Sequence, residues 1–239
     1  MIPPLVSVLL PTSRRPEWAR QTFRMLEDQT YKNLELVIVN AGEPIGDLPA
    51  FAREILAKKK GFPEQNGQTI LEARGEILVF TDDDDYYAPT RIERQVEPIL
   101  AGRATVTGMK MYYYVEVPAM RWYHHPPSSP PPGSPPGWSV PFFEGSACFH
   151  RDALRHFTRA ELERIWRSPF INRLKDNGEK IEIIPNRNAI VRVQHVEGST
   201  GDKNCYTRDL SRWIPTKTPT EIPSYVLEFW RRGGKAVAV

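Results

Sequence analysis

The feature that most constrains this chain is a run of four aspartates, Asp82 to Asp85, directly after an apolar segment. Residues 77–80 are Ile, Leu, Val and Phe, which is typical of a strand buried on both faces of a parallel sheet. Four adjacent carboxylates at the end of such a strand are electrostatically unfavourable unless a positive group neutralises them, and a divalent cation with oxygen ligands can do so. Ligands of open α/β sheets bind outside the carboxyl ends of the strands. The run therefore predicts a metal-dependent site for a phosphate-bearing ligand. The alternative, a solvated acidic loop, is disfavoured by the buried strand before it and by the helix-starting Pro89 after it.

The first part of the chain alternates between expected strands and expected helices. Apolar segments predict strands at residues 6–10, 34–39 and 77–80. Ser13 is the expected N-cap and Pro16 the expected first-turn residue of a helix that follows the first strand. Further helices are expected at residues 48–57, 68–74 and 91–100. This alternation predicts an α/β fold, a three-layer α/β/α sandwich with a mainly parallel central sheet, in which strand 6–10 lies between the other two.

The second half of the chain has a different character. Residues 124–137 are rich in proline and predict a mobile, polyproline-like loop. A capping box is expected at Thr158 and Glu161, and Ser168 and Pro169 are expected to cap and begin the next helix. The remaining expected elements are strands within 104–117 and at 180–184 and 189–194, and an amphipathic stretch at 225–231.

The composition is that of an ordinary globular protein. The 239 residues carry a formal net charge of +3, which is too small to argue for a nucleic-acid partner. No apolar run approaches the roughly 20 residues that cross a membrane, and the first eleven residues do not have the character of a signal peptide. Cys148 and Cys205 predict reduced thiols in a cytoplasmic protein rather than a disulfide framework.

Several segments, taken together, resemble a known family. The acidic run after its strand, at residues 75–85 with Pro89, is similar to the DXD-type motif of family 2 glycosyltransferases of the GT-A fold. The first two expected strands match the amino-terminal segments of that family, and residues 145–151 resemble its later acceptor-side segment. The resemblance covers roughly residues 5–195. It implies a nucleotide-sugar-binding half at 1–102, an acceptor-side half at 103–200 and a C-terminal extension at 201–239.

The resemblance also implies roles for individual residues. It implies a nucleotide-sugar donor, a carbohydrate or other hydroxyl acceptor, and Mn²⁺ or Mg²⁺ as the cation that stabilises the leaving diphosphate. Asp84 is the implied metal ligand, with Asp85 and His195 as further ligands; an imidazole can bind Mn²⁺ beside carboxylates, although His195 could equally be a surface residue. The implied donor-binding residues are Pro11, Thr12, Arg14, Asn40, Arg74, Asp82 and Asp83. Asn40 stands where the family usually has an acidic residue that holds the base.

The catalytic base is the main departure from the family. Inverting members typically present a Glu-Asp pair at the start of the helix after the acceptor segment, where this chain has residues 166–168, Trp-Arg-Ser. An inverting displacement needs a carboxylate that takes the acceptor's proton. Glu144 is the favoured candidate because it directly precedes the expected acceptor-side residues Gly145 and Ser146, and Glu163 is the next. The other nearby carboxylates are Asp152 and Glu161.

Three functions therefore stay open. The first is transfer of a sugar to a hydroxyl acceptor, with inversion. The second is the same chemistry on hydroxymethylated bases of DNA, for which the basic region after the Pro-rich loop would contact phosphates. The arginines of this region are Arg151, Arg155, Arg159, Arg164, Arg167 and Arg173, and an ordinary helical surface explains them as well. The third is a catalytically inactive module that binds the donor.

Overall fold

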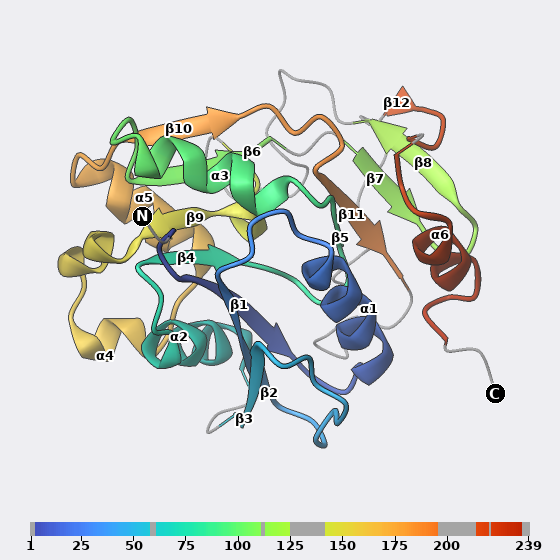
Figure 1. The fold of residues 1–239 in the computed structure, drawn as a ribbon, viewed down its shortest axis with the longest axis horizontal. Coiled ribbons are helices and arrows are strands. Elements are labelled where there is room, and N and C mark those ends of the chain that lie inside the picture. Colours follow the sequence, from blue (N-terminus) through green and yellow to red (C-terminus); the bar gives the residue numbers. More distant parts are fainter. Residues whose placement is uncertain are drawn as a thin grey trace.

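Two β-sheets organise the part of the chain that the computed structural model describes, which is residues 3–57, 61–110, 113–124, 142–195, 214–219 and 221–235 (Figure 1). The larger sheet has seven strands and the smaller has five. The Pro-rich segment 125–141 and Cys205 lie outside the described residues, so the predicted mobile loop and the predicted state of that cysteine are not addressed by the structure. Cys148 is a free, buried thiol.

The larger sheet has the predicted parallel centre. Its strands run in the order β10-β6-β9-β4-β1-β2-β3. β1 pairs in parallel with both β2 and β4, which confirms the predicted middle position of the first strand, and β9 is antiparallel to both β4 and β6. The bounds are β1 Val6–Thr12, β2 Leu34–Asn40, β3 Ala52–Leu56, β4 Ile77–Phe80, β6 Val106–Met109, β9 Cys148–His150 and β10 Ile181–Ile184.

Helices cover both faces of this sheet, so the predicted three-layer sandwich is confirmed (Figure 1). Alternate residues of β1 face opposite layers: Val8 packs with helices α1 and α3, whereas Leu9 packs with α2 and α5. The helices are α1 Pro16–Glu27, α2 Phe62–Glu72, α3 Arg91–Leu100, α4 Arg159–Leu162 and α5 Arg167–Asp176. Two 3₁₀ helices, Glu144–Ser146 and Arg151–His156, flank β9.

The smaller sheet lies beside α1, and the C-terminal helix packs on it (Figure 1). Its strands run in the order β12-β8-β7-β11-β5. Helix α6, Ser224–Arg231, packs its buried Val226 and Trp230 onto a cluster that also contains Trp18, Tyr86 and Trp122. The strands are β5 Tyr86–Tyr87, β7 Tyr113–Glu116, β8 Arg121–His124, β11 Ile190–Gln194 and β12 Ile214–Pro215. None of the helices in the described ranges has the length and apolar character needed to cross a membrane.

Three local predictions were wrong. The helix expected at 48–57 is instead strand β3, which pairs in parallel with β2, because Arg53 and Glu54 find distant partners in Glu35 and Asn40 along that edge. The helix expected at 68–74 begins earlier, at Phe62. Ser13 and Ser168 are not N-caps: the cap residues of α1 and α5 are Arg15 and Trp166, neither of which makes a side-chain capping bond.

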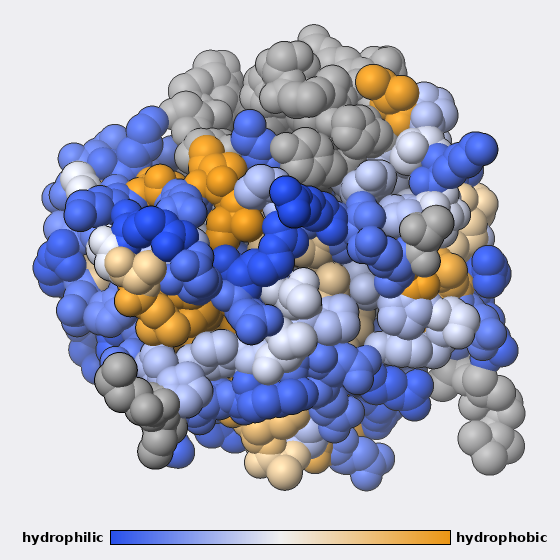
Figure 2. All heavy atoms as spheres, turned by 45° about the horizontal axis from the view of Figure 1, so that its top comes forward, coloured by the Kyte–Doolittle hydropathy of each residue, from blue (hydrophilic) through white to orange (hydrophobic). Residues whose placement is uncertain are grey.

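Other local predictions were confirmed. Pro16 and Pro169 lie in the first turns of their helices, where no backbone N–H is required. The capping box of α4 is complete, with Thr158 and Glu161 bonding to each other's backbone N–H groups. Figure 2 shows a mostly hydrophilic surface with separate apolar patches. A mostly hydrophilic surface is expected where helices bury their apolar face and expose their polar face.

Candidate active site

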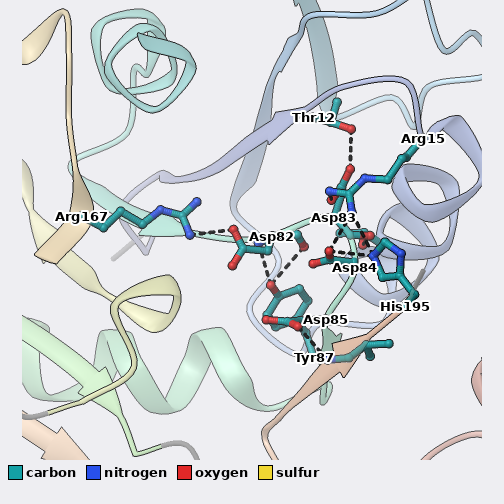
Figure 3. Close-up of polar contacts among 11 residues, drawn as sticks. Thr12, Arg15, Asp82, Asp83, Asp84, Asp85, Tyr87, Arg167 and His195 are labelled. Atoms are coloured by element: carbon teal, nitrogen blue, oxygen red, sulfur yellow. Dashed lines mark hydrogen bonds and ion pairs between the residues drawn. The ribbon is translucent and has the colours of Figure 1, made fainter. Parts of the chain in front are cut away.

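The four aspartates lie at the carboxyl end of β4, beside the end of β1 (Figure 3). Tyr87 holds the backbone at this point: its hydroxyl donates to the Asp82 carbonyl at 3.0 Å and accepts from the Asp82 N–H at 2.6 Å. Burial raises the pKa of Tyr87 well above its usual value, so the phenol stays protonated and keeps this donor bond. The acidic loop is therefore fixed at its first residue.

Arg91 packs against Tyr87 and stabilises the residues that precede the acidic run. Its guanidinium is fully buried, lies 4.3 Å from the centre of the Tyr87 ring, and donates to the Phe80 carbonyl at 2.5 Å and to Thr81 Oγ1 at 3.1 Å. Burial lowers the pKa of Arg91, but an arginine starts so high that the group stays charged. It places a permanent positive charge under the start of the acidic run.

Asp83 points back toward β1 and is buried. Thr12 Oγ1 donates to its Oδ2 at 2.5 Å, and Arg15 forms an ion pair with its Oδ1. Burial is the largest influence and raises the pKa of Asp83 to about 6, although the Arg15 charge opposes the rise. Both carboxylate oxygens are thus engaged by residues at the end of β1 and the start of α1.

Asp84, Arg15 and His195 meet in a triangle of polar atoms (Figure 3). Arg15 Nη1 lies 2.8 Å from Asp84 Oδ2 and 2.9 Å from His195 Nε2, and these two acceptor atoms are 3.0 Å apart. Burial would raise the pKa of Asp84, but the charge of Arg15, the largest opposing influence, helps to hold that pKa below its usual range. Asp84 is therefore an ionised carboxylate that faces an imidazole nitrogen.

Trp18 of α1 holds the imidazole of His195. The two rings stack with centroids 4.3 Å apart and an interplanar angle of 24°. His195 is 5% exposed, so the alternative that it is a surface residue is wrong. Behind Trp18, Phe229 of α6 packs edge-on at 4.9 Å. The C-terminal helix thereby supports the position of a histidine in the site.

Asp85 faces the smaller sheet. Its Oδ1 accepts from the Val193 N–H of β11 at 3.0 Å, and its Oδ2 is buried without a hydrogen-bond partner among the residues that the structure describes. Burial, followed by the charges of Asp84 and Asp82, raises the pKa of Asp85 well above its usual value. Asp85 thus joins the two sheets through its bond to β11 and keeps one spare oxygen.

Asp82 points away from the other three, toward α5 (Figure 3). Arg167 Nη1 forms an ion pair with Asp82 Oδ1 at 2.6 Å, and Arg167 Nε donates to Asn66 Oδ1 at 3.0 Å. The Arg167 side chain is buried, with its guanidinium over the rings of Phe62 and Phe80. The place expected for a catalytic base is therefore filled by a cation that binds the first aspartate.

The two candidate bases lie in different settings. Glu144 begins the 3₁₀ helix whose next residue, Gly145, approaches Asp82 so closely that an added Cβ would sit 2.8 Å from Asp82 Oδ2. Glu144 is half-buried, and its carboxylate has no hydrogen bond or ion pair with any described residue. Glu163 is exposed at the end of α4, where its backbone packs on Gly67. Of the two, the structure brings Glu144 close to the acidic run.

The other predicted site residues are dispersed. Thr12 and Asn40 are paired neighbours at the ends of β1 and β2, and the exposed Arg14 follows at a positive φ of 56°. Asn40 is buried and its amide bonds Glu54 and the backbone of residues 42 and 43, so it shapes the loop after β2. The remaining three are Pro11, buried in β1; Ser146, whose hydroxyl bonds the backbone of Met109 and Phe143; and Arg74.

Arg74 is not brought to the site. It precedes β4, and its backbone N–H donates to Glu35 near the start of β2, so it lies at the amino ends of the parallel strands. The acidic run lies at the carboxyl ends. The length of strand β4 therefore separates Arg74 from Asp82, so Arg74 is not part of this site.

The side chains at this point provide some, but not all, of the ligands that a divalent cation needs. Asp84 Oδ2 and His195 Nε2 converge on one point, and a magnesium or manganese site commonly uses one or two such ligands and completes its shell with substrate phosphates. Within the described ranges no three His, Cys, Asp or Glu side chains form a ready-made cage. The point of convergence is held by Arg15 Nη1. The residues fit an ion that arrives together with a phosphate ligand.

Comparison with known proteins identifies the family. The sequence profile described as Glycosyl transferase family 2 matches residues 7–196, which is most of the chain. The chain belongs to glycosyl transferase family 2. The match begins in β1 and ends just after His195, so it includes the acidic run, Arg15 and His195.

Relatives and solved structures agree with this assignment. A Rickettsia bellii protein described as an uncharacterized glycosyltransferase is 30% identical over 101 residues, which are 39% of this chain and 15% of that protein. The glycosyltransferase YwdF of Bacillus subtilis, also described as uncharacterized, is 28% identical over 101 residues, which are 39% of this chain and 38% of YwdF. This chain is therefore similar to a minor part of each of these longer proteins.

The solved structures show the fold. A mannosyltransferase from Pyrobaculum calidifontis, in complex with GDP-Man and Mn²⁺, matches with a TM-score of 0.55 at 14% identity, over 81% of this chain and 57% of that one. TarS 1-349 of S. aureus in complex with UDP-GlcNAc matches with a TM-score of 0.58 at 13% identity, over 82% and 60%. The family 2 chain thus has the GT-A fold that the sequence predicted.

Proposed function

We propose that this protein transfers a sugar from a nucleotide-sugar donor to a hydroxyl acceptor, with inversion, and that it uses Mn²⁺ or Mg²⁺. The observation that carries the proposal is the convergence of Asp84 Oδ2 and His195 Nε2, 3.0 Å apart, at the carboxyl end of a central parallel strand. This is the edge where α/β proteins bind ligands. The mannosyltransferase with GDP-Man and Mn²⁺ and TarS with UDP-GlcNAc support the donor class.

The proposed donor site extends from the end of β1 to the acidic loop. Thr12, Arg14 and Asn40 would hold the nucleotide. Asp83 accepts a hydrogen bond from the Thr12 hydroxyl and so fixes that side chain. Asp82, with its backbone clamped by Tyr87, would accept hydrogen bonds from hydroxyl groups of the ribose or the sugar. Arg167 pairs with Asp82 Oδ1 and so holds this carboxylate in place.

The proposed metal ligands are Asp84 and His195, with Asp85 as a further candidate through its Oδ2, which has no hydrogen-bond partner among the described residues. A divalent cation held there would offset the negative charge that develops on the diphosphate leaving group. Trp18 restricts the imidazole to one plane, and a ligand held in one orientation loses little entropy when it binds. Removal of Asp84 takes away a carboxylate oxygen that lies 3.0 Å from His195 Nε2 at this point.

We propose Glu144 as the base, with Gly145 and Ser146 on the acceptor side. Glu144 would take the proton of the acceptor hydroxyl, while the acceptor oxygen bonds to the anomeric carbon. The bond from that carbon to the β-phosphate oxygen breaks, and its electron pair leaves with the nucleoside diphosphate. Glu144 suits this role because its carboxylate makes no bond to other described residues and its neighbour Gly145 touches Asp82.

Transfer to DNA bases has less support from the geometry. Most arginines that made this region look basic are engaged with partners of their own chain. Arg155 pairs with Glu179, Arg164 with Glu64, Arg173 with Glu161 and Arg167 with Asp82, and Arg151 bonds the Gly75 carbonyl. Cations that are already paired are poor phosphate contacts, so a carbohydrate or other small hydroxyl acceptor is favoured.

A nucleotide-sugar screen tests the proposal. The melting temperature of the protein is measured with Mn²⁺ and, one at a time, GDP-mannose, UDP-GlcNAc and UDP-glucose, and hydrolysis of each stabilising donor is then followed. At least one donor is expected to stabilise the wild-type protein in the presence of Mn²⁺ and to be hydrolysed slowly without acceptor. Stabilisation without hydrolysis or transfer would instead identify an inactive binding module.

The matched variant for this screen is Asp84→Asn. It is expected to keep the fold, because Arg15 retains Asp83 as a partner, and to lower hydrolysis by about 10²-fold or more, in the range seen when one group that stabilises developing charge is removed. Full activity of Asp84→Asn would contradict the metal role of this residue.

A further inference from the structure

We propose that Arg15 is the resident cation of this site: in the donor-free protein its guanidinium holds the position of the divalent ion, and it moves to the donor diphosphate when the ion binds. The inference rests on the proposed function and adds to it a residue that orders the binding of metal and donor. It is carried by the contacts of the Arg15 side chain, which is 7% exposed.

The first step of the argument is the geometry around Arg15 Nη1. This nitrogen bears two hydrogens, and two acceptor atoms lie within bonding distance, Asp84 Oδ2 at 2.8 Å and His195 Nε2 at 2.9 Å. One hydrogen can point to each acceptor if His195 presents its Nε2 lone pair. A carboxylate oxygen and an imidazole lone pair directed at one cationic point are the arrangement of two metal ligands.

The second step excludes the other arrangement of these atoms. A direct hydrogen bond from His195 Nε2 to Asp84 Oδ2, 3.0 Å away, would need the proton on Nε2. Arg15 Nη1, which can only donate, would then face an N–H group at 2.9 Å. Arg15 Nη1 is satisfied at both of its contacts only when the guanidinium is the shared donor to Asp84 Oδ2 and His195 Nε2.

The third step is electrostatic. A guanidinium and a divalent ion cannot both lie within about 3 Å of the same two ligand atoms, because two positive charges at that distance repel each other strongly in a buried site. A divalent ion that binds Asp84 and His195 must therefore displace Arg15 Nη1. The displaced guanidinium keeps Asp83 as a partner through Nη2. The two hydrogens of the freed Nη1 can then bond to diphosphate oxygens.

The consequence is that ion and donor favour each other's binding. Without a diphosphate, expulsion of Arg15 opposes metal binding, and with a diphosphate the expelled group gains a new anionic partner. Coupling of this kind is reciprocal, so the ion must raise the affinity for the diphosphate by the same factor. The donor-free protein is expected to bind Mn²⁺ weakly, although the two ligands are already in place.

The experiment measures Mn²⁺ binding to the donor-free protein, by loss of the free-ion electron paramagnetic resonance signal. Arg15→Met is expected to bind Mn²⁺ about tenfold or more tightly than the wild type, because the competing charge is gone. Arg20→Met removes one positive charge from a half-exposed position on the same helix α1 and is expected to leave the Mn²⁺ affinity unchanged. In the double variant Arg15→Met with Asp84→Asn the gain is expected to vanish.

Thermal unfolding of the same proteins gives a second readout. Arg15→Met leaves Asp83 and Asp84 without their buried partner, so it is expected to melt at a lower temperature than the wild type and to recover when Mn²⁺ is added. Arg15→Gln keeps N–H donors without the charge and replaces Arg15→Met if that variant does not fold. The same gain in Mn²⁺ affinity is expected of it.

The outcomes separate this inference from the proposed function. Equal Mn²⁺ affinity of Arg15→Met and wild type would overturn the role of Arg15, whether or not the wild type hydrolyses a nucleotide sugar. Tighter Mn²⁺ binding by Arg15→Met supports it even if no donor in the screen is turned over, in which case the proposed function alone fails. A gain in Arg20→Met equal to that in Arg15→Met would also overturn it, since net charge would then explain both.

Discussion

Adjacent aspartates in this chain have separate tasks because successive side chains of the loop point in different directions. Asp82 faces Arg167 of α5, Asp83 turns back to Thr12 of β1, and Asp85 reaches the backbone of β11. Asp84 is left facing His195 and Arg15. Four adjacent negative charges would repel one another in isolation. In the folded chain they interact with partners in or next to α5, β1, α1 and β11. The proposed metal ion would therefore act at one of these positions, Asp84, and not at all four.

At the residue scale, the base assignment gives the sharpest prediction. Glu144→Gln is expected to keep donor and metal binding and to lower the rate of transfer by about 10²–10⁴-fold, since an amide cannot take the acceptor's proton. The measurement is the transfer rate at saturating donor from pH 6 to pH 9, with donor affinity determined in parallel.

The matched control is Glu163→Gln, an exposed carboxylate on α4 that makes no side-chain bond to another described residue. It is expected to change the rate by less than about twofold, as surface substitutions usually have small effects. Wild-type activity of Glu144→Gln together with a large loss in Glu163→Gln would transfer the assignment to Glu163.

Glu35 gives a prediction for stability at the opposite end of the strands. Its burial favours the neutral acid, but hydrogen bonds from Ser7 Oγ at 2.5 Å and from the Arg74 N–H at 2.6 Å, together with the nearby charge of Arg53, lower its pKa below 4.5. Glu35→Gln is expected to lower the free energy of unfolding at pH 7 by about 1–2 kcal/mol, the worth of a charged hydrogen bond. Urea unfolding measures this difference.

The sign of the pH dependence follows from the lowered pKa. The folded state favours ionised Glu35, so its stabilising contribution is full above pH 4.5 and is lost as the pH falls through the lower folded-state pKa. The difference in unfolding free energy between wild type and Glu35→Gln is therefore expected to be largest at pH 7 and to shrink on acidification below pH 4.5. A difference that grows at acid pH would contradict this account of Glu35.

At the scale of elements, the parts of the fold that depend on local pattern could be predicted, and the parts that depend on distant partners could not. Strands β1, β2 and β4 and helix α3 lie where their apolar periodicity placed them. Residues 52–56 have an apolar spacing that suits a helix as well as a strand. They form a strand because they pair with the edge of β2. Local propensity carries no information about that edge.

The same division applies to the site. The acidic run was identified from the end of an apolar strand and His195 through the family resemblance, whereas Arg15 and Arg167 were missed. Arg15 had a usable signal, because it follows β1, and the carboxyl ends of adjacent parallel strands meet at one edge of the sheet. Arg167 had none: its partner Asp82 is 85 residues away and belongs to an element on the other side of the Pro-rich segment.

Helix α6 provides the prediction for this scale. Trp230 is 1% exposed and packs at 6.0 Å from Trp122 and at 6.5 Å from Tyr86, measured between ring centroids. Trp230→Ala is expected to lower the free energy of unfolding by about 3–5 kcal/mol, because it leaves a cavity between the helix and the smaller sheet. Leu227→Ala, at a half-buried position of the same helix, is the control and is expected to cost less. A loss below about 1 kcal/mol for Trp230→Ala would mean that α6 contributes little to the fold.

At the scale of the whole molecule, the site lies at the junction of the two sheets. The larger sheet supplies the aspartates from the end of β4, and the smaller sheet receives Asp85 on β11 and ends that strand beside His195. Helix α6 then reaches back over Trp18, against which Gly234 packs so closely that an added Cβ would sit 2.3 Å from the indole. The C-terminal segment, which the sequence marked as an extension, is therefore part of the support of the site.

The connection between the sheets gives the last prediction. Strand β8 ends at His124, and the chain becomes described again at Phe142, two residues before Glu144. The intervening Pro-rich segment thus leads directly into the 3₁₀ helix that places Glu144 and Gly145 beside Asp82. Deletion of residues 126–136 is expected to leave donor hydrolysis unchanged and to lower transfer, because most of the proposed donor-binding residues lie at the ends of β1 and β4 whereas the proposed acceptor side begins at residue 144.

The control replaces residues 126–136 with glycine and serine at equal length, which keeps the connection but removes the prolines. If chain length alone matters, this variant transfers sugar like the wild type, and if the proline-rich sequence contacts the acceptor, it fails like the deletion. Both rates are measured with one donor at saturation. Loss of hydrolysis and transfer together in the deletion would show that the segment is needed to hold Glu144–Ser146 against the acidic loop, since Gly145 lies so close to Asp82 that an added Cβ would sit 2.8 Å from Asp82 Oδ2.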